Sequence, residues 1–253
     1  MTYLSRIRIN PLRQQSRELL SNPQTMHSHV CAAIPATPDT ERLLWRLDTD
    51  NPHRPHLIAL TRSKPDWTHL VEAAGWPAAD DGGHCDIADY TPLLAQLAIG
   101  REFTFRLTAN PVQNMPRPLR SGDTAGAEDP KTRQRRSSVR TGHRTYAHQL
   151  NWLLKRTAGY GFQIPDARTD PGLPILPLDE STPAPDVRII HRDRVSFNKK
   201  NRRQVVLHVA TFQGRLQVTD TDLLARALLN GVGPAKAYGC GLLTLAPSRR
   251  PNG

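Results

Sequence analysis

The sequence of 253 residues has no apolar run that approaches the ~18 residues of a membrane-spanning helix, so no membrane partner is expected. Its first residues, MTYLSRIRIN, lack an apolar segment of the kind found in secretory signals, and no such signal is expected. Three scattered cysteines, Cys31, Cys85 and Cys240, argue against a disulfide framework and against a cysteine-based zinc site. Together these absences predict a protein of the reducing cytoplasm.

Acidic and aromatic residues are also scarce. Against 34 Lys and Arg there are 23 Asp and Glu, which gives a net charge of +11 and a pI near 10.2. Such an excess favours a polyanionic partner, nucleic acid first. Aromatic residues make up 6% of the chain, which disfavours base stacking as the main mode of binding.

Two segments hold most of the excess positive charge. Residues 117–144 carry eight Lys or Arg and three acidic residues, and residues 192–203 carry six and one. Residues 121–145 contain almost no large apolar side chain, so we predict a loop that becomes ordered on RNA. Alternating apolar residues on both sides of 198–203 predict a β-hairpin over 186–212 with a basic tip. Each run could be an ordinary solvated surface; if the two converge, they form a groove for phosphates.

Two short alternating segments, 3–9 and 103–109, each end at an Asn-Pro pair and lie 100 residues apart. Proline ends a central strand, so each segment is interpreted as the first strand of one of two related units. The remaining expected elements are a helix from Pro23 to about 33 capped by Asn22, paired strands at 42–49 and 56–63, a short helix at 66–74, a loop at 75–86, a partly helical segment at 90–99, a helix at 146–157, a strand at 215–218, a helix at 222–229 and a closing strand to 247.

This order, β-α-β-β-α-β in each half, predicts an α+β protein with two tandem ferredoxin-like (RRM-like) domains. We expect an N-terminal domain over 1–98 and a C-terminal domain over 99–247, with a flexible basic insertion at 121–141. Residues 248–253 are expected to form a frayed tail.

The strongest local motif is GVGPAKAYGCG at 231–241, with four glycines in eleven residues. Glycines permit positive φ angles and close backbone approach, so their amides, together with Lys236, could bind phosphates. A tight helix-to-strand turn explains the motif equally well. Its spacing matches neither a Walker A nor a GxGxxG motif.

GVGPAKAYGCGLLTLAP also resembles the closing signature of the CasE family, the CRISPR-repeat endoribonucleases of type I-E Cascade systems. YLSRIRINP, the NPxxMH helix, RLLWRL, FRLTANP and the Trp152 helix match in the same order, whereas the 121–141 loop is longer than usual. The resemblance implies tandem ferredoxin-like domains that bind the repeat hairpin and cut precursor crRNA at the 3′ base of the stem. It implies cleavage without a metal or other cofactor, a 2′,3′-cyclic phosphate and a 5′-hydroxyl as products, and other Cascade subunits as partners.

By this resemblance His27, in NPQTMH, is the catalytic residue. An imidazole with a pKa near ~6.5 can accept a proton from the ribose 2′-OH or donate one to the leaving oxygen, and the sequence leaves both roles open. An ordinary helical histidine is the alternative interpretation. His29 is expected at the surface, and Cys31 is not expected to act as a thiolate, because 2′-OH attack needs no protein nucleophile. Some family members carry a tyrosine and a lysine where this chain has Gln24 and Ala32, so either another group completes the site or His27 carries more of the rate.

RNA contacts are predicted from the basic segments and the glycine motif. Lys236 or an arginine is expected to stabilise charge on the transition-state phosphorane. The predicted RNA-binding residues are Arg133, Arg135, Arg136, Arg140, Arg144, Arg192, Arg194, Lys199, Lys200, Arg202, Arg203, Gly231, Gly233, Lys236, Gly239 and Gly241. No metal site is predicted, since the pairs Asp48/Asp50 and Asp220/Asp222 are interpreted as turn and cap residues.

Two other functional classes remain open at this point. One is a non-catalytic RNA-binding protein with two RRM-like domains; the other is a structural subunit of Cascade or of the ribosome. Phe103 and Phe105 alternate on a predicted strand, but no RNP1 string is present. In either class, His27→Ala would leave RNA function unchanged.

Overall fold

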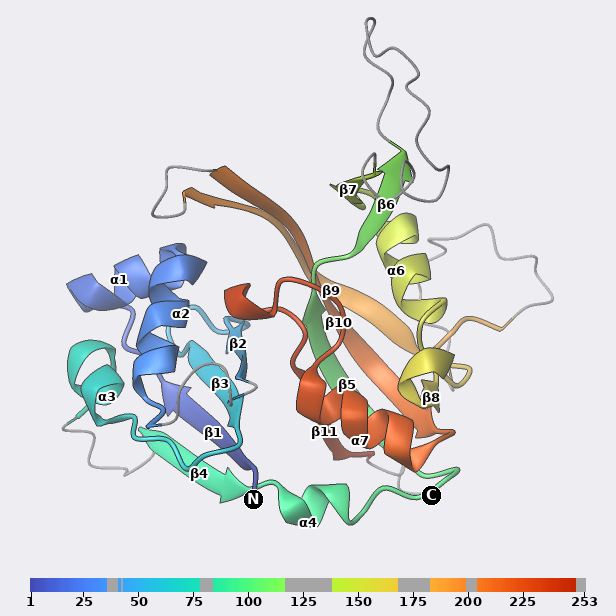
Figure 1. Ribbon diagram of the computed structural model, residues 1–253, viewed down its shortest axis with the longest axis horizontal. Coiled ribbons are helices and arrows are strands. Elements are labelled where there is room, and N and C mark those ends of the chain that lie inside the picture. The colour runs from blue at the N-terminus through green and yellow to red at the C-terminus, as the bar shows by residue number, and fades with distance from the viewer. Residues whose placement is uncertain are drawn as a thin grey trace, which may run out of the picture.

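The computed structural model describes residues 1–35, 41, 43–77, 84–116, 138–167, 183–198 and 204–248. Figure 1 shows two units beside each other, each built on a β-sheet with helices packed against it. None of the described helices has the length and apolar composition of a membrane span.

The first unit is an antiparallel four-stranded sheet in the order β2-β3-β1-β4. This is the strand order of a ferredoxin-like fold, in which the first strand lies between the third and the fourth. Its core includes Ile7, Met26, Val30 and Trp45. The elements are β1 (Tyr3–Arg8), α1 (Gln14–Ser21), α2 (Pro23–Ala32), β2 (Leu44–Asp48), β3 (His56–Thr61), α3 (Thr68–Ala74) and β4 (Cys85–Asp89).

The second unit repeats this plan with additions, after a connection that contains α4 (Thr91–Leu94). Its sheet has the order β11-β5-β10-β8, with β9 also paired to β10, and β6 and β7 form a separate two-stranded sheet. In Figure 1 the β9–β10 hairpin projects beyond the sheet, towards the side of the first unit. The elements are β5 (Glu102–Ala109), β6 (Val112–Pro116), β7 (Ser138–Gly142), α6 (Tyr146–Leu154), η1 (Ala158–Tyr160), β8 (Phe162–Gln163), β9 (Val187–Asn198), β10 (Gln204–Val218), α7 (Thr221–Asn230), η2 (Lys236–Tyr238) and β11 (Leu243–Pro247).

The two strand orders confirm the predicted α+β class and the tandem ferredoxin-like architecture. β1 and β5, the two segments that end at Asn-Pro, are the corresponding first strands of the two sheets. The Asn22 side chain accepts a hydrogen bond of 3.0 Å from the Gln24 amide, with Pro23 at the first helical position, as predicted.

Several expectations were wrong in detail. α1, β6 and β8 were not predicted, and β4 and β7 occupy residues assigned in part to a loop. The hairpin's second strand does not end at 212: β10 runs without a break to Val218. Gly214 allows this continuation, because a Cβ there would lie 2.1 Å from the Asp186 carbonyl oxygen, which in turn accepts a bond of 2.9 Å from the Arg215 amide.

Arg46 joins the two units. It lies on β2 and is 3% exposed. Its Nε and Nη2 donate to the Asp48 carboxylate at 2.7 and 3.0 Å. Nη1 reaches across to the second unit, where it donates to the carbonyls of Arg106 and Leu242 at 3.1 and 3.2 Å and to Thr244 Oγ1 at 3.0 Å.

Asp48 and Asp50 were interpreted as turn residues, and the structure corrects this. Asp48 is the carboxylate partner of the buried Arg46, and Asp50 accepts a bond of 2.6 Å from Arg106. Asp220 does cap a helix, since its side chain accepts a bond of 2.8 Å from the Leu223 amide at the start of α7.

Candidate active site and nucleic-acid interface

Helix α2 carries the predicted catalytic histidine. Met26 and Val30 are fully buried and fix which face of the helix packs on the sheet. Because successive residues turn by about 100°, His27 and Cys31 lie together on one flank of the helix, and His29 lies on the other. The flank occupied by His29 faces α1, where Gln15 Nε2 is 3.4 Å from His29 Nε2.

The His27 ring is half-buried and contacts the Cys31 thiol. The Cys31 sulfur lies 3.8 Å from Nδ1 and 3.7 Å from Nε2. Burial lowers the pKa of His27 and raises the pKa of the Cys31 thiol. The neutral forms of both groups are therefore favoured near neutral pH.

The glycine motif brings η2 against α2 and β2. Gly231 and Gly239 have φ angles of 76° and 78°, and both pack on β2. A Cβ at 231 would lie 2.7 Å from Leu44 Cδ2, and one at 239 would lie 2.8 Å from Trp45 Cζ3. Glycine is required at these positions by the close approach of the two units as well as by the backbone angle.

Three of the four glycine amides of this motif donate hydrogen bonds inside the protein. Gly231 donates to the Ala227 carbonyl at 2.8 Å and Gly241 to the Thr108 carbonyl at 2.7 Å. The Gly233 amide donates to the Tyr160 hydroxyl at 3.3 Å. These three amides do not point at a phosphate site, so the structure favours the turn interpretation of the glycines over phosphate binding by their amides.

Lys236 and Tyr238 lie on η2, where the motif packs against α2 and β2 of the first unit. The stem of Lys236 folds over the motif: a Cβ at 231 would lie 3.0 Å from its Cε, and one at 241 would lie 3.2 Å from its Cγ. The Tyr238 ring packs on Phe197, with centroids 4.8 Å apart and planes tilted by 57°. This contact joins the β9–β10 hairpin to η2. Because η2 also packs on α2, it lies between the hairpin and α2.

The two basic segments meet beside the middle of β9. The exposed Arg192 donates to Gln149 Oε1 at 2.8 Å and to the Arg144 carbonyl. Arg194 pairs in register with His208, whose pKa is lowered first by burial and then by Arg144 and Arg194. Arg144 from one run and Arg192 and Arg194 from the other therefore lie close together.

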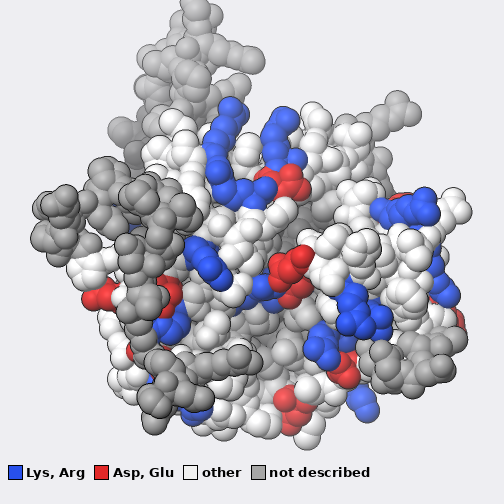
Figure 2. All heavy atoms as spheres, turned by 180° about the vertical axis from the view of Figure 1, so that it is seen from behind, with Lys and Arg blue, Asp and Glu red and all other residues white. Residues whose placement is uncertain are grey.

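Several predicted RNA contacts lie outside the described residues: Arg133, Arg135, Arg136, Lys199, Lys200, Arg202 and Arg203. Arg140 is a backbone position of β7. On the rear face, Figure 2 shows acidic side chains beside basic ones rather than one unbroken basic field. Within the described part of the chain, no group of three or more His, Cys, Asp or Glu side chains is placed to hold a metal ion.

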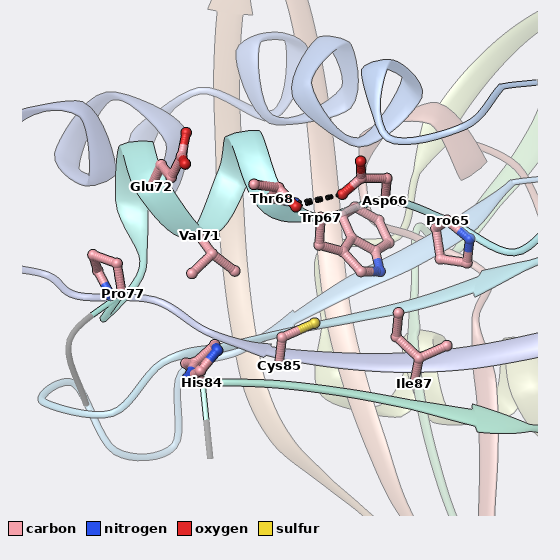
Figure 3. Close-up of a pocket in the computed structure, with 10 residues that line it drawn as sticks. All are labelled: Pro65, Asp66, Trp67, Thr68, Val71, Glu72, Pro77, His84, Cys85 and Ile87. Atoms are coloured by element: carbon pink, nitrogen blue, oxygen red, sulfur yellow. Dashed lines mark hydrogen bonds between the residues drawn. The ribbon is translucent and has the colours of Figure 1, made fainter. Parts of the chain in front are cut away.

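A separate hollow of about 390 Å³ lies between α3 and β4 (Figure 3). Trp67, Val71 and Cys85 line it, and the Asp66 carboxylate at its edge is bonded to the Thr68 hydroxyl. Strand β4 is at the edge of its sheet opposite to β2, so the hollow is remote from η2. Burial raises the pKa of the Cys85 thiol to about 11. None of the predicted site residues lies in this hollow.

Comparison with known proteins decides the family. A family model described as "CRISPR associated protein" matches residues 2–247. The chain belongs to this CRISPR-associated family. It is 29% identical over 248 residues to the CRISPR-associated endoribonuclease Cse3 of Thermus thermophilus, an alignment that covers 97% of this chain and 100% of the relative. It is 25% identical over 247 residues to the CRISPR system Cascade subunit CasE of Escherichia coli, covering 97% and 99%.

Solved structures of relatives agree with this assignment to the CRISPR-associated family. Thermus thermophilus Cse3 bound to an RNA representing a pre-cleavage complex superposes with a TM-score of 0.69 at 26% identity, over 97% of this chain and 99% of that one. Cse3 bound to a 19-nucleotide RNA gives a TM-score of 0.68 at 25% identity, with the same coverage.

Proposed function

We propose that this chain is a metal-independent endoribonuclease that binds the CRISPR repeat hairpin and cleaves precursor crRNA at the 3′ base of the stem. Near full-length similarity to an endoribonuclease supports the activity. The position of His27 supports its assignment as the catalytic residue. It is half-buried on the flank of α2 away from α1, and α2 packs against η2, which carries Lys236.

The reaction needs one proton removed and one supplied. The ribose 2′-oxygen attacks the adjacent phosphorus as its proton passes to His27, and a 2′,3′-cyclic phosphate forms. The bond from phosphorus to the 5′-oxygen breaks, and this oxygen takes a proton from water to become the 5′-hydroxyl. Burial lowers the pKa of His27, so the neutral imidazole that can accept the 2′-OH proton is the main form near pH 7. Proton transfer of this kind contributes typically ~10²–10⁴-fold, and the remainder comes from holding the RNA for in-line attack.

Binding is assigned to the basic surface where β9 meets the start of α6. Arg144, Arg192 and Arg194 converge there, and we propose that they contact phosphates of the stem together with the predicted contacts of 133–140 and 199–203. A-form RNA hides its base edges in a deep major groove, so shape and phosphate recognition should dominate. Lys236 is proposed to stabilise the phosphorane charge.

Product retention and cellular setting complete the proposal. A relative is named as a Cascade subunit, which supports retention of the cleaved crRNA in a complex with other Cascade subunits. The three cysteines are free thiols, which is consistent with the cytoplasm. The division into domains 1–98 and 99–247 stays a prediction.

Binding without cleavage is the second candidate function. It is favoured by Gln24 and Ala32, which place no ionisable group where some family members carry tyrosine and lysine, and Ala32 is exposed.

One gel separates the two functions. The protein and its His27→Ala variant are incubated in excess EDTA with a labelled hairpin of the CRISPR repeat from the same genome. A single cut that survives EDTA and disappears in the variant is expected. Binding without cutting in both lanes would leave a binding subunit, and a cut that EDTA abolishes but the variant keeps would refute both the metal independence and the role of His27.

A further inference from the structure

We propose that Cys31 is a positioning residue for His27, whose thiol holds the imidazole in the orientation required for proton transfer. The inference rests on the proposed role of His27 in cleavage. It assigns no nucleophilic role to the sulfur, since the attacking group belongs to the RNA.

The contact geometry supports a packing role. The sulfur is nearly equidistant from the two ring nitrogens, at 3.8 and 3.7 Å, whereas a single linear hydrogen bond would favour one of them. The thiol therefore packs against the ring. Among the described residues, no other atom forms a hydrogen bond with the His27 ring. Cys31 is therefore a contact that restrains rotation of the imidazole.

The helix makes this restraint rigid. The two residues are four apart on α2, so their side chains are neighbours on one flank. Met26 and Val30, buried on the adjacent face, fix the rotation of the helix about its axis. A small misplacement of a catalytic group can cost ~10²-fold in rate, so a restraint on the ring has kinetic value.

The thiol is suited to this place because it stays uncharged. Burial raises its pKa, so it shields one side of the imidazole from water without adding charge. The elements packed against α2 carry Lys236 and Tyr238 on η2, Arg17 and Glu18 on α1, but burial alone shifts the pKa of His27. Removal of the thiol should therefore admit water and move this pKa back up towards its usual value.

The test is single-turnover cleavage of the repeat hairpin by the whole protein, with Cys31→Ala, Cys31→Ser and the control Cys85→Ser. We expect Cys31→Ala to cut about 10-fold more slowly, with unchanged RNA affinity, and the limb of its pH–rate profile assigned to His27 to move to higher pH. Cys31→Ser keeps a polar group of similar size and should recover most of the rate. Cys85 lines the remote hollow, so its serine variant should cut like the wild type.

Alkylation provides an independent readout that does not depend on folding of a variant. N-ethylmaleimide attached to Cys31, verified by mass spectrometry, should block cleavage in the folded protein, and the Cys31→Ser protein should resist it although Cys85 remains. A wild-type rate with an unshifted pH limb in Cys31→Ala, or full activity of the Cys31 adduct, would overturn the inference. Cleavage retained by His27→Ala would instead refute the proposed function itself.

Discussion

Replacing Arg46 with methionine removes the guanidinium that links the two units while keeping most of its apolar stem. The substitution leaves the Asp48 carboxylate, whose side chain is 20% exposed, without its bidentate donor. It also removes one donor from the Leu242 carbonyl and from Thr244 Oγ1. The Arg106 carbonyl keeps a bond from the Thr244 hydroxyl at 3.3 Å, so its loss is partly compensated.

The magnitude follows from these losses. Removing one partner of a buried ion pair costs ~3–5 kcal/mol. Asp48 is partly solvated and lies 3.6 Å from Arg106, which places its contribution at the lower end of this range. A carbonyl left without a donor adds ~1 kcal/mol. We therefore expect Arg46→Met to lower the free energy of unfolding by about 3–4 kcal/mol.

The assay is urea unfolding followed by circular dichroism, with Arg6→Met as the matched control. Arg6 also pairs with an aspartate, Asp86, at 2.8 Å, but the two side chains are 62% and 53% exposed. Such an exposed pair contributes ~0–1 kcal/mol. The double variant Arg46→Met/Asp48→Leu should recover part of the loss, because it removes the unpaired carboxylate. Equal, small effects of Arg46→Met and Arg6→Met would refute the reasoning.

Three further predictions follow from the site. His27→Ala should lower the rate of single-turnover cleavage by ~10²–10⁴-fold at unchanged RNA affinity. Because burial lowers the pKa of His27 and the neutral ring is the base, wild-type cleavage should be retained at pH 7 and lost only below about pH 6.5. A cleavage rate that rises on acidification would contradict the base role. Gly239→Ala should destabilise the protein by ~1–2 kcal/mol or more in urea unfolding, because its Cβ meets Trp45, whereas Ala235→Gly, at a φ of 67°, should not destabilise it; equal losses in both would refute the packing argument. Arg194→Ala should weaken RNA binding and reduce the slope of log affinity against log salt by ~1, and an unchanged slope would remove Arg194 from the phosphate contacts.

Local signals explain which elements could be predicted. α2 and α7 each begin at a capping side chain, Asn22 and Asp220, that lies beside its helix in the sequence. α1 begins at Gln14, and its N-cap residue Arg13 makes no side-chain capping bond. The helix buries only Ser16 and Leu19, so it carries little of the usual pattern. β4 is exposed along most of its length and is defined by pairing with β1, some 80 residues away, which no alternation of its own side chains reveals.

Some features of the candidate site could likewise be predicted from local sequence, and others could not. The role of His27 stays a prediction from the family resemblance, and its contact with Cys31 follows from helical spacing. The position of η2 against α2 was not predictable, because it depends on Gly231 and Gly239 meeting Leu44 and Trp45 of the other unit.

The sequence by itself determined the net charge, the order of most strands and helices, and the helix that holds His27, because these depend on composition and on residues within a few positions of one another. Only the tertiary structure decided three features. The glycine motif packs on β2, and three of its four glycine amides are bonded inside the protein. Arg46 is a buried link between the two units, and Arg144 of one basic run lies beside Arg192 and Arg194 of the other. Each of these features depends on contacts between segments that are far apart in the chain. The packing of the two units determines such contacts, and the pattern of neighbouring residues in the sequence does not.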